Sequence, residues 1–263
     1  MRRILTAGVA GALALADFSV PGVVAAPRGF GQRGGQAPPR PPLPPALPGR
    51  PGSPAPPSEP GTARPMPRRL FRTQDLGLLN APDRDQWQRP DFIMDELHIF
   101  DGAIVADVGA AGGWFTIRLA RRVGPNGLVI AEDIQPQMLE AITRRVQNER
   151  LQNVRTVLGA ATDPRLPGDL DAVLIVDAYR EIEDPVTLLR NLQRSLKPQG
   201  LVGIVDFTPG GGGPGPNREE RVDPDTVVRD ASAAGLRLIK REAIPPFLFL
   251  LVFGKGAGPR GPA

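Results

Sequence analysis

Apolar residues from about residue 73 onward alternate between two spacings. Short continuous apolar runs predict buried strands, and they lie at 103–108, 128–133, 154–159, 172–177, 201–206, 236–243 and 247–253. Apolar residues three or four positions apart predict helices, and these lie at 83–97, 114–123, 135–149, 184–196 and 223–235. Such alternation of strand and helix indicates parallel strands with helices on both faces of one sheet.

The predicted fold class is therefore α/β, with a doubly wound, mostly parallel seven-stranded sheet. Ile244, Pro245 and Pro246 join the last two predicted strands. We expect this closing pair to give the sheet an antiparallel C-terminal edge strand.

An aspartate lies at the end of each of four predicted strands: Asp107, Asp133, Asp177 and Asp206. In doubly wound sheets, ligands bind at the carboxyl ends of the strands. Any one of these aspartates could instead cap a helix or lie in a solvated loop. Together they predict a ligand site at one edge of the sheet.

The stretch VADVGAAGGWFT (105–116) places a glycine-rich turn between a predicted strand and a helix. A phosphate-binding loop would end in Gly-Lys-Ser/Thr, and residues 109–116 contain no lysine. A dinucleotide-binding turn would read G-x-G-x-x-G, but the second and third glycines are out of place. S-adenosylmethionine has no phosphate, and acidic residues at strand ends suit its ammonium group and its ribose hydroxyls.

Residues 83–254 resemble the class I S-adenosylmethionine-dependent methyltransferases, in particular small bacterial members. Residues 107–113 resemble the D-x-G-x-G-x-G loop of this family, and VIAEDIQPQML (129–139) resembles its ribose-binding segment. GAATDPRLP (159–167) resembles the stretch that borders adenine. LDAVLIVDAYREIEDP (170–185) and LKPQGLVGIVDF (196–207) resemble the fourth and fifth strands with their flanking turns. The resemblance implies a Rossmann-like methyltransferase fold.

The resemblance also implies S-adenosylmethionine as cofactor and a set of contact residues. It places Asp133 at the ribose and Asp163 at the adenine. The cofactor-binding residues expected on this basis are Asp107, Gly109, Ala110, Ala111, Gly113, Asp133, Ile134, Asp163 and Asp177.

Two departures from the family pattern concern the site. Ala111 replaces the middle glycine of the loop, which either crowds the cofactor or is accommodated by a small shift. Where relatives commonly carry histidine after the fourth strand, this chain has Tyr179, Arg180 and Glu181. These three residues are candidates for contact with the methyl acceptor, although a solvated loop explains them equally well.

The first part of the chain differs in composition from the rest. Residues 1–26 combine a charged start, a short apolar run and small residues, as in a secretory leader. Residues 27–72 are rich in proline, glycine and arginine, which predicts a disordered linker. We therefore expect a methyltransferase domain at 73–257 and a flexible tail at 258–263. The protein would be periplasmic or secreted if the leader functions, and cytoplasmic otherwise.

Charge and composition narrow the functional classes. The chain has a formal net charge of +4, but residues 1–72 carry +8 and the remainder −4, so nucleic acid is not an expected partner. With no cysteine and one histidine, thiolate metal sites and a conventional catalytic triad are excluded, and no metal is predicted. The sequence predicts in-line methyl transfer to a small-molecule acceptor that it does not identify. The alternative is an inactive scaffold of the same fold in the cell envelope.

Overall fold

The computed structural model of the chain describes residues 70–256. The predicted leader, most of the predicted linker and the predicted tail lie outside these residues and remain predictions. Within residues 70–256, no helix is both long and apolar enough to cross a membrane. The elements, in chain order, are η1 (Thr73–Asn80), α1 (Arg84–Gln88), α2 (Pro90–Glu96), β1 (Ile104–Val108), α3 (Trp114–Val123), β2 (Leu128–Asp133), α4 (Pro136–Asn148), β3 (Val154–Leu158), β4 (Leu170–Val176), η2 (Tyr179–Glu181), α5 (Pro185–Ser195), β5 (Leu196–Phe207), η3 (Arg218–Glu220), α6 (Pro224–Ala233), β6 (Leu236–Ile244) and β7 (Leu248–Lys255).

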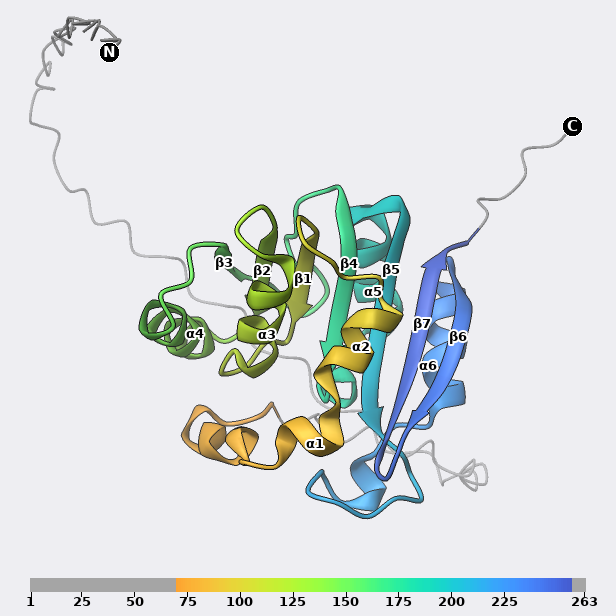
Figure 1. Ribbon diagram of the computed structural model, residues 1–263. Coiled ribbons are helices and arrows are strands. Elements are labelled where there is room, and N and C mark those ends of the chain that lie inside the picture. Colours follow the sequence, from red (N-terminus) through yellow and green to blue (C-terminus); the bar gives the residue numbers. More distant parts are fainter. Residues whose placement is uncertain (1–69, 257–263) are drawn as a thin grey trace, which may run out of the picture. The chain divides into compact units, whose positions relative to one another are not determined.

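One seven-stranded sheet organises the domain, with the strand order β3-β2-β1-β4-β5-β7-β6. The five strands β1 to β5 pair in parallel. Strand β7 pairs antiparallel with both β5 and β6, so the antiparallel strand lies between β5 and the edge strand β6 (Figure 1). The strand order reverses direction at β1 and β4, which is where such sheets bind ligands.

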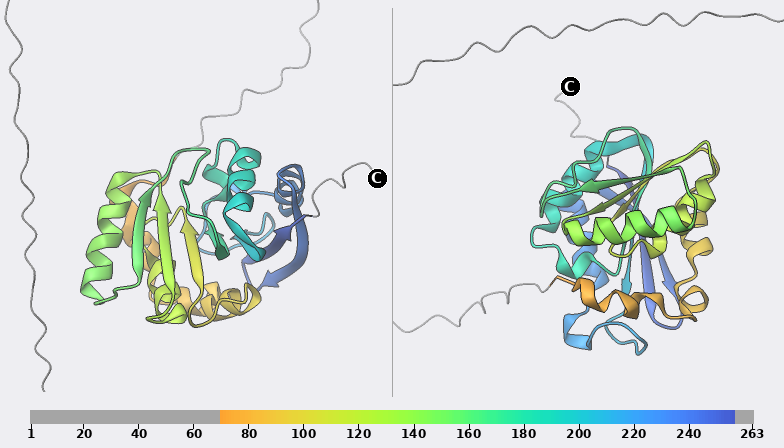
Figure 2. Two further views of the ribbon diagram at one scale, coloured as in Figure 1. Left: turned by 90° about the horizontal axis from the view of Figure 1, so that it is seen from above. Right: turned by 90° about the vertical axis from the view of Figure 1, so that its left-hand side faces the viewer.

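Helices cover both faces of the sheet, as the alternating pattern predicts (Figure 2). Successive side chains of a strand point to opposite faces, and β1 illustrates the division. Val105 packs into the cluster that contains α2 and α3 side chains, whereas Ala106 packs with α5 and α6. Helix α4 packs against β2 and β3 through Ile142 and Leu139.

The sequence predicts most element boundaries to within two residues, but three segments differ. Strand β5 begins at Leu196, five residues before the strand predicted at 201–206. The helix expected at 83–97 is split at Arg89, which has a left-handed φ of 48°. Pro90 explains the break, because proline disfavours helical backbone at the preceding residue. Residues 70–72, assigned above to the linker, contact the domain: the Phe71 N–H donates to Glu181 Oε2 at 2.9 Å.

Candidate functional site

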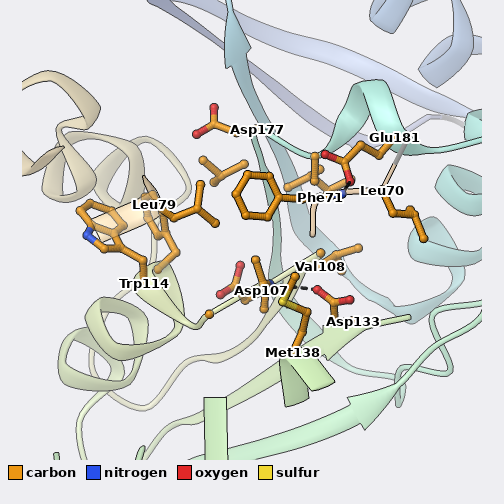
Figure 3. Close-up of a pocket in the computed structure, with 18 of the residues that line it drawn as sticks. Leu70, Phe71, Leu79, Asp107, Val108, Trp114, Asp133, Met138, Asp177 and Glu181 are labelled. Atoms are coloured by element: carbon orange, nitrogen blue, oxygen red, sulfur yellow. Dashed lines mark hydrogen bonds between the residues drawn. The ribbon is translucent and has the colours of Figure 1, made fainter. Parts of the chain in front are cut away.

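A cavity of about 510 Å³ lies at the carboxyl ends of β1, β2 and β4. Its wall combines the loop after β1, the ends of the neighbouring strands and several residues of the segment 70–84, which leads up to the first residue of α1. Figure 3 shows acidic side chains and apolar side chains facing this space. Most of the residues predicted to bind the cofactor line the cavity: Asp107, Gly109, Ala110, Ala111, Asp133, Ile134 and Asp177.

The loop after β1 exposes main chain to the cavity. Gly109 has a φ of 68°, and a Cβ atom placed on it would lie 2.9 Å from the Cβ of Ala178. A side chain at this position would therefore be strained and crowded. Ala111 also has a left-handed φ of 46°, the conformation for which the family pattern keeps a glycine. Gly113, with a φ of 75°, is the N-cap residue that precedes α3 and does not line the cavity.

Asp107 is buried beneath this loop. Thr116, on the first turn of α3, donates its hydroxyl to Asp107 Oδ2 at 2.6 Å. Burial raises the pKa of Asp107 to about 6, against the lowering effect of the Thr116 hydrogen bond. The carboxyl is thus held in place by α3 and is still mostly ionised at neutral pH.

The end of β2 presents two consecutive acids. Asp133 accepts hydrogen bonds from the backbone N–H groups of Ala111 and Gln135, both at 2.9 Å. These bonds fix its carboxylate at the rim of the cavity (Figure 3). Ile134 beside it lines the cavity and is 37% exposed.

Glu132, which precedes Asp133, is a cavity residue that the sequence analysis did not single out. Its Oε2 accepts from the Gly109 N–H at 3.3 Å. Its other oxygen lies over Gly159, where an added Cβ would come within 1.7 Å of Oε1. Burial raises the pKa of Glu132 to about 8. The pairing of an acid with the glycine that follows the adjacent strand β3 is a long-range relation that local sequence patterns do not reveal.

The opposite end of the cavity contains Asp177, which follows β4. Arg84 of α1 donates to Asp177 Oδ2 at 3.2 Å, and both side chains are largely buried. Burial raises the pKa of Asp177 to about 6, although the charge of Arg84 opposes this effect. Figure 3 places Asp177 and Asp133 at different ends of the drawn site.

The three predicted acceptor-side residues have different positions. Arg180 and Glu181 line the cavity and form an ion pair at 3.0 Å. Tyr179 does not line it, because the side chain is buried on the other face of the sheet and its hydroxyl donates to Asp230 of α6 at 2.8 Å. The acceptor-side assignment therefore remains a prediction for Arg180 and Glu181, and the contacts of Tyr179 favour a structural role.

Two further predicted residues lie apart from the cavity wall. Asp163 is exposed, and its carboxylate accepts from the N–H of Arg165. Ala160 and Ala161 line the cavity in that region instead. Asp206 is buried at the end of β5; burial, together with the charge of Asp177, raises its pKa to about 7.

The segment 70–72 crosses the cavity. The Phe71 N–H donates to Glu181, and the Phe71 carbonyl oxygen accepts from the Gln135 side chain at 3.0 Å. These contacts connect the loop after β4 with the loop after β2, and the Phe71 ring lies inside the site (Figure 3). Phe71 was not predicted as a site residue, because it lies at the end of a segment whose composition indicates a linker.

Comparisons with known proteins agree with this geometry. Residues 105–200 match the family model of the methyltransferase domain. The chain is 30% identical over 131 residues to the demethylmenaquinone methyltransferase of Lactobacillus johnsonii, a match that covers 49% of this chain and 53% of that protein. It is 33% identical over 129 residues to the ubiquinone/menaquinone biosynthesis C-methyltransferase of Pasteurella multocida, which covers 46% of each. The chain thus spans about half the length of these curated relatives.

A solved structure extends the likeness to the complete domain. A SAM-dependent methyltransferase from Aquifex aeolicus superposes with a TM-score of 0.67 at 25% identity, over 70% of this chain and 98% of that one. The strand order, the glycine loop after β1 and the acid at the end of β2 occur in the region that these comparisons match. Residues 105–200 thus match a methyltransferase domain, and residues 70–256 have the Rossmann-like fold of S-adenosylmethionine-dependent methyltransferases, which supports S-adenosylmethionine as the cofactor.

Proposed function

We propose that this domain transfers the methyl group of S-adenosylmethionine, in line, to a small-molecule acceptor with an apolar ring. One observation supports this above the others: a single cavity combines exposed backbone and carboxylates at the ends of β1 and β2 with aromatic side chains on its wall. The aromatic side chains of that wall include Trp87, Phe71 and Phe207. The names of the two relatives given above refer to quinones, which contain a ring. This is consistent with such an acceptor.

The residues at the ends of β1 and β2 fit S-adenosylmethionine. Asp133 presents a fixed carboxylate that can accept hydrogen bonds from a ribose diol, and Ile134 offers an apolar surface for the adenine. Gly109 lets the main chain approach the ligand closely. Acidic side chains also suit a sulfonium nucleoside that carries an ammonium group, because opposite charges attract strongly at a buried site.

The chain's contribution to the reaction is mainly one of position. S-adenosylmethionine, when bound, supplies an activated methyl group. The domain holds the two reactants in a near-attack geometry and excludes water, effects that can lower a barrier by about 7–11 kcal/mol. The ring centre of Trp87 lies 6.0 Å from that of Phe207 and 6.4 Å from that of Phe247, so Trp87 and Phe207 form an aromatic part of the cavity wall.

Calorimetric titration of the full chain tests this proposal. We expect micromolar affinity for S-adenosylmethionine and no binding of NADH. Asp133→Ala should weaken S-adenosylmethionine at least 10-fold, because hydrogen bonds to a charged group are worth about 1.5–3 kcal/mol. Asp163→Ala is a matched control, because Asp163 is exposed and does not line the cavity. It should leave the affinity for S-adenosylmethionine nearly unchanged. If neither S-adenosylmethionine nor NADH binds, the scaffold alternative is favoured and the methyltransferase proposal is wrong.

A further inference from the structure

Exposed large apolar side chains are concentrated at one edge of the domain. Residues 70–256 contain six of them. Four lie at the edge where the parallel strands end, and three of these four also line the cavity. We call these four the apolar rim: Leu70 (43% exposed), Leu78 (75%), Ile134 (37%) and Leu158 (42%). Single exposed apolar side chains are ordinary, but a group of them at one place marks a surface that binds a partner or a membrane.

The members of the rim on the two outer parallel strands are neighbours. Asp133 pairs with Leu158 in the register of β2 and β3, and Ile134 directly follows Asp133, so Ile134 and Leu158 lie at the ends of adjacent strands. The segment that carries Leu70 is joined to the same place. The Gln135 side chain donates to the carbonyl oxygen of the residue after Leu70 at 3.0 Å. Three of the four rim residues therefore meet at one corner of the cavity.

The fourth member, Leu78, lies on the 3-10 helix η1. This helix contains no buried residue, and it lies beyond the ends of the parallel strands, in the orange segment of Figure 1. Arg145 of α4 donates to Asn80 at the end of η1 at 2.9 Å, so the helix is held beside α4, which follows Ile134. The core of the domain does not use Leu78, and its exposure calls for another explanation.

Positive charge precedes the rim in the sequence. Residues 27–69 carry seven arginines and one glutamate, a net charge of +6. The last three of these arginines lie within six residues of Leu70, which is at most about 20 Å of extended chain. They are Arg64, Arg68 and Arg69. Arg72, after Leu70, is paired with Asp75, so the unbalanced charge near the rim comes from the arginines before it.

We propose that the apolar rim docks on the surface of an anionic lipid bilayer. The rim side chains enter the interface, and the arginines before Leu70 bind the lipid phosphates. Binding to such surfaces increases with the apolar area that is buried and with the attraction to anionic lipids. A nucleic acid would bind the arginines but leave the rim exposed, whereas an anionic bilayer accounts for both.

The docking places the opening of the cavity against the lipid, because three of the four rim residues line the cavity. An apolar methyl acceptor dissolved in the bilayer could then enter the cavity without crossing water. This consequence rests on the proposed function. The docking itself does not, since it depends only on the rim and on the charge before it.

Co-sedimentation of the full chain with vesicles tests the docking. The vesicles consist either of equal parts of phosphatidylglycerol and phosphatidylcholine or of phosphatidylcholine alone. The unmodified protein should bind the anionic vesicles at least about 10-fold more tightly than the neutral ones, and added salt should reduce this preference. A triple variant should lose most of the preference: Arg64→Gln, Arg68→Gln and Arg69→Gln.

Variants of the rim separate its contribution from that of the arginines. Leu78→Ser should weaken binding to the anionic vesicles about 10-fold, because it removes an apolar side chain that enters the interface. Ile239→Ser is the matched control: Ile239 is 48% exposed, lies in β6 and does not line the cavity. It should change the binding by less than about 2-fold. Leu158→Ser should act in the same direction as Leu78→Ser, so the test stands if one of the two does not fold.

Three outcomes would overturn the docking. The first is that the unmodified protein binds neither kind of vesicle. The second is that Leu78→Ser and Leu158→Ser bind the anionic vesicles as tightly as Ile239→Ser does, which would mean that the arginines alone bind lipid. The third is that sedimentation velocity shows a dimer that Leu78→Ser converts to a monomer, because the rim would then be an interface between two copies of the chain. Titration with S-adenosylmethionine is made without vesicles, so the proposed function and the docking can each fail while the other stands.

Discussion

Glu132 offers a sharp test of the electrostatics of the site, because its carboxyl is buried and has one backbone donor. Glu132 is 3% exposed, and the Gly109 N–H donates to its Oε2 at 3.3 Å. Burial raises the pKa from an ordinary 4.5 to about 8, and the neighbouring Asp133 and Asp107 add to the effect. The neutral variant Glu132→Gln has nearly the same shape and cannot ionise.

The sign of the expected effect follows from proton binding. The folded chain holds the Glu132 proton more tightly than the unfolded chain, so acid favours folding and the stability falls as the pH rises from 4.5 to 8. One pH unit corresponds to about 1.4 kcal/mol. The cost to the folded state is therefore about 3 kcal/mol at pH 7, about 4 kcal/mol at pH 8 and about 5 kcal/mol well above pH 8.

Glu132→Gln should remove this pH-dependent cost. The free energy of unfolding of the variant, minus that of the unmodified protein, should increase with pH between 5 and 8 and then level off. Urea unfolding followed by tryptophan fluorescence measures this difference, since both tryptophans of the chain, Trp87 and Trp114, lie in the domain. The comparison is made without ligand, because a bound cation would change the pKa.

Glu140→Gln is the matched control, since the Glu140 side chain is 68% exposed. It should alter the free energy of unfolding by less than about 0.5 kcal/mol at each pH. A constant offset between Glu132→Gln and the unmodified protein from pH 5 to 8 would refute the reasoning. It would show that the Glu132 carboxyl is as well solvated in the folded chain as in the unfolded one.

Two further predictions concern the loop and the segment that crosses the cavity. Ala111 has a left-handed φ, which glycine adopts freely and a β-branched residue does not. Ala111→Gly should therefore change the free energy of unfolding by less than about 1 kcal/mol, whereas Ala111→Val should lower it by about 2 kcal/mol. Similar urea midpoints for both variants would contradict this. Glu181→Ala removes the acceptor of the Phe71 N–H, so release of S-adenosylmethionine in stopped-flow displacement should accelerate about 3- to 10-fold. An unchanged rate would mean that residues 70–72 do not retain the ligand.

The sheet and most helices were predictable because their signals are local. The apolar runs at 128–133 and 154–159 are short and bounded by polar or glycine residues, and both became strands. Helix α3 was predicted with its observed bounds, since its apolar stripe follows the glycine loop directly. The position of β7 between β5 and β6 is different in kind, because pairing among distant strands depends on the packing of the complete sheet.

The part of the cavity wall formed by the loop after β1 and the end of β2 was more predictable than the part around Asp177 and Phe71, for the same reason. Residues 107–113 and Asp133 lie in two contiguous motifs, so their spacing could be compared with a family pattern. The part around Asp177 and Phe71 depends on contacts between distant segments: Arg84 meets Asp177 across 93 residues, and Phe71 meets Glu181 across 110. No local pattern marks such pairs, and a composition typical of a linker concealed Phe71.

The buried acids connect the stability of the domain with its ligand. Asp107, Glu132 and Asp177 have pKa values raised to about 6, 8 and 6, so the ligand-free domain should gain stability on acidification in this range. A sulfonium nucleoside binds the ionised carboxyls better than the neutral ones, so its affinity should instead increase with pH. The same side chains thus act in opposite directions on folding and on binding. Carboxyls that reduce the stability of the empty domain are retained where their charge is needed, which is the usual relation between stability and function at a binding site.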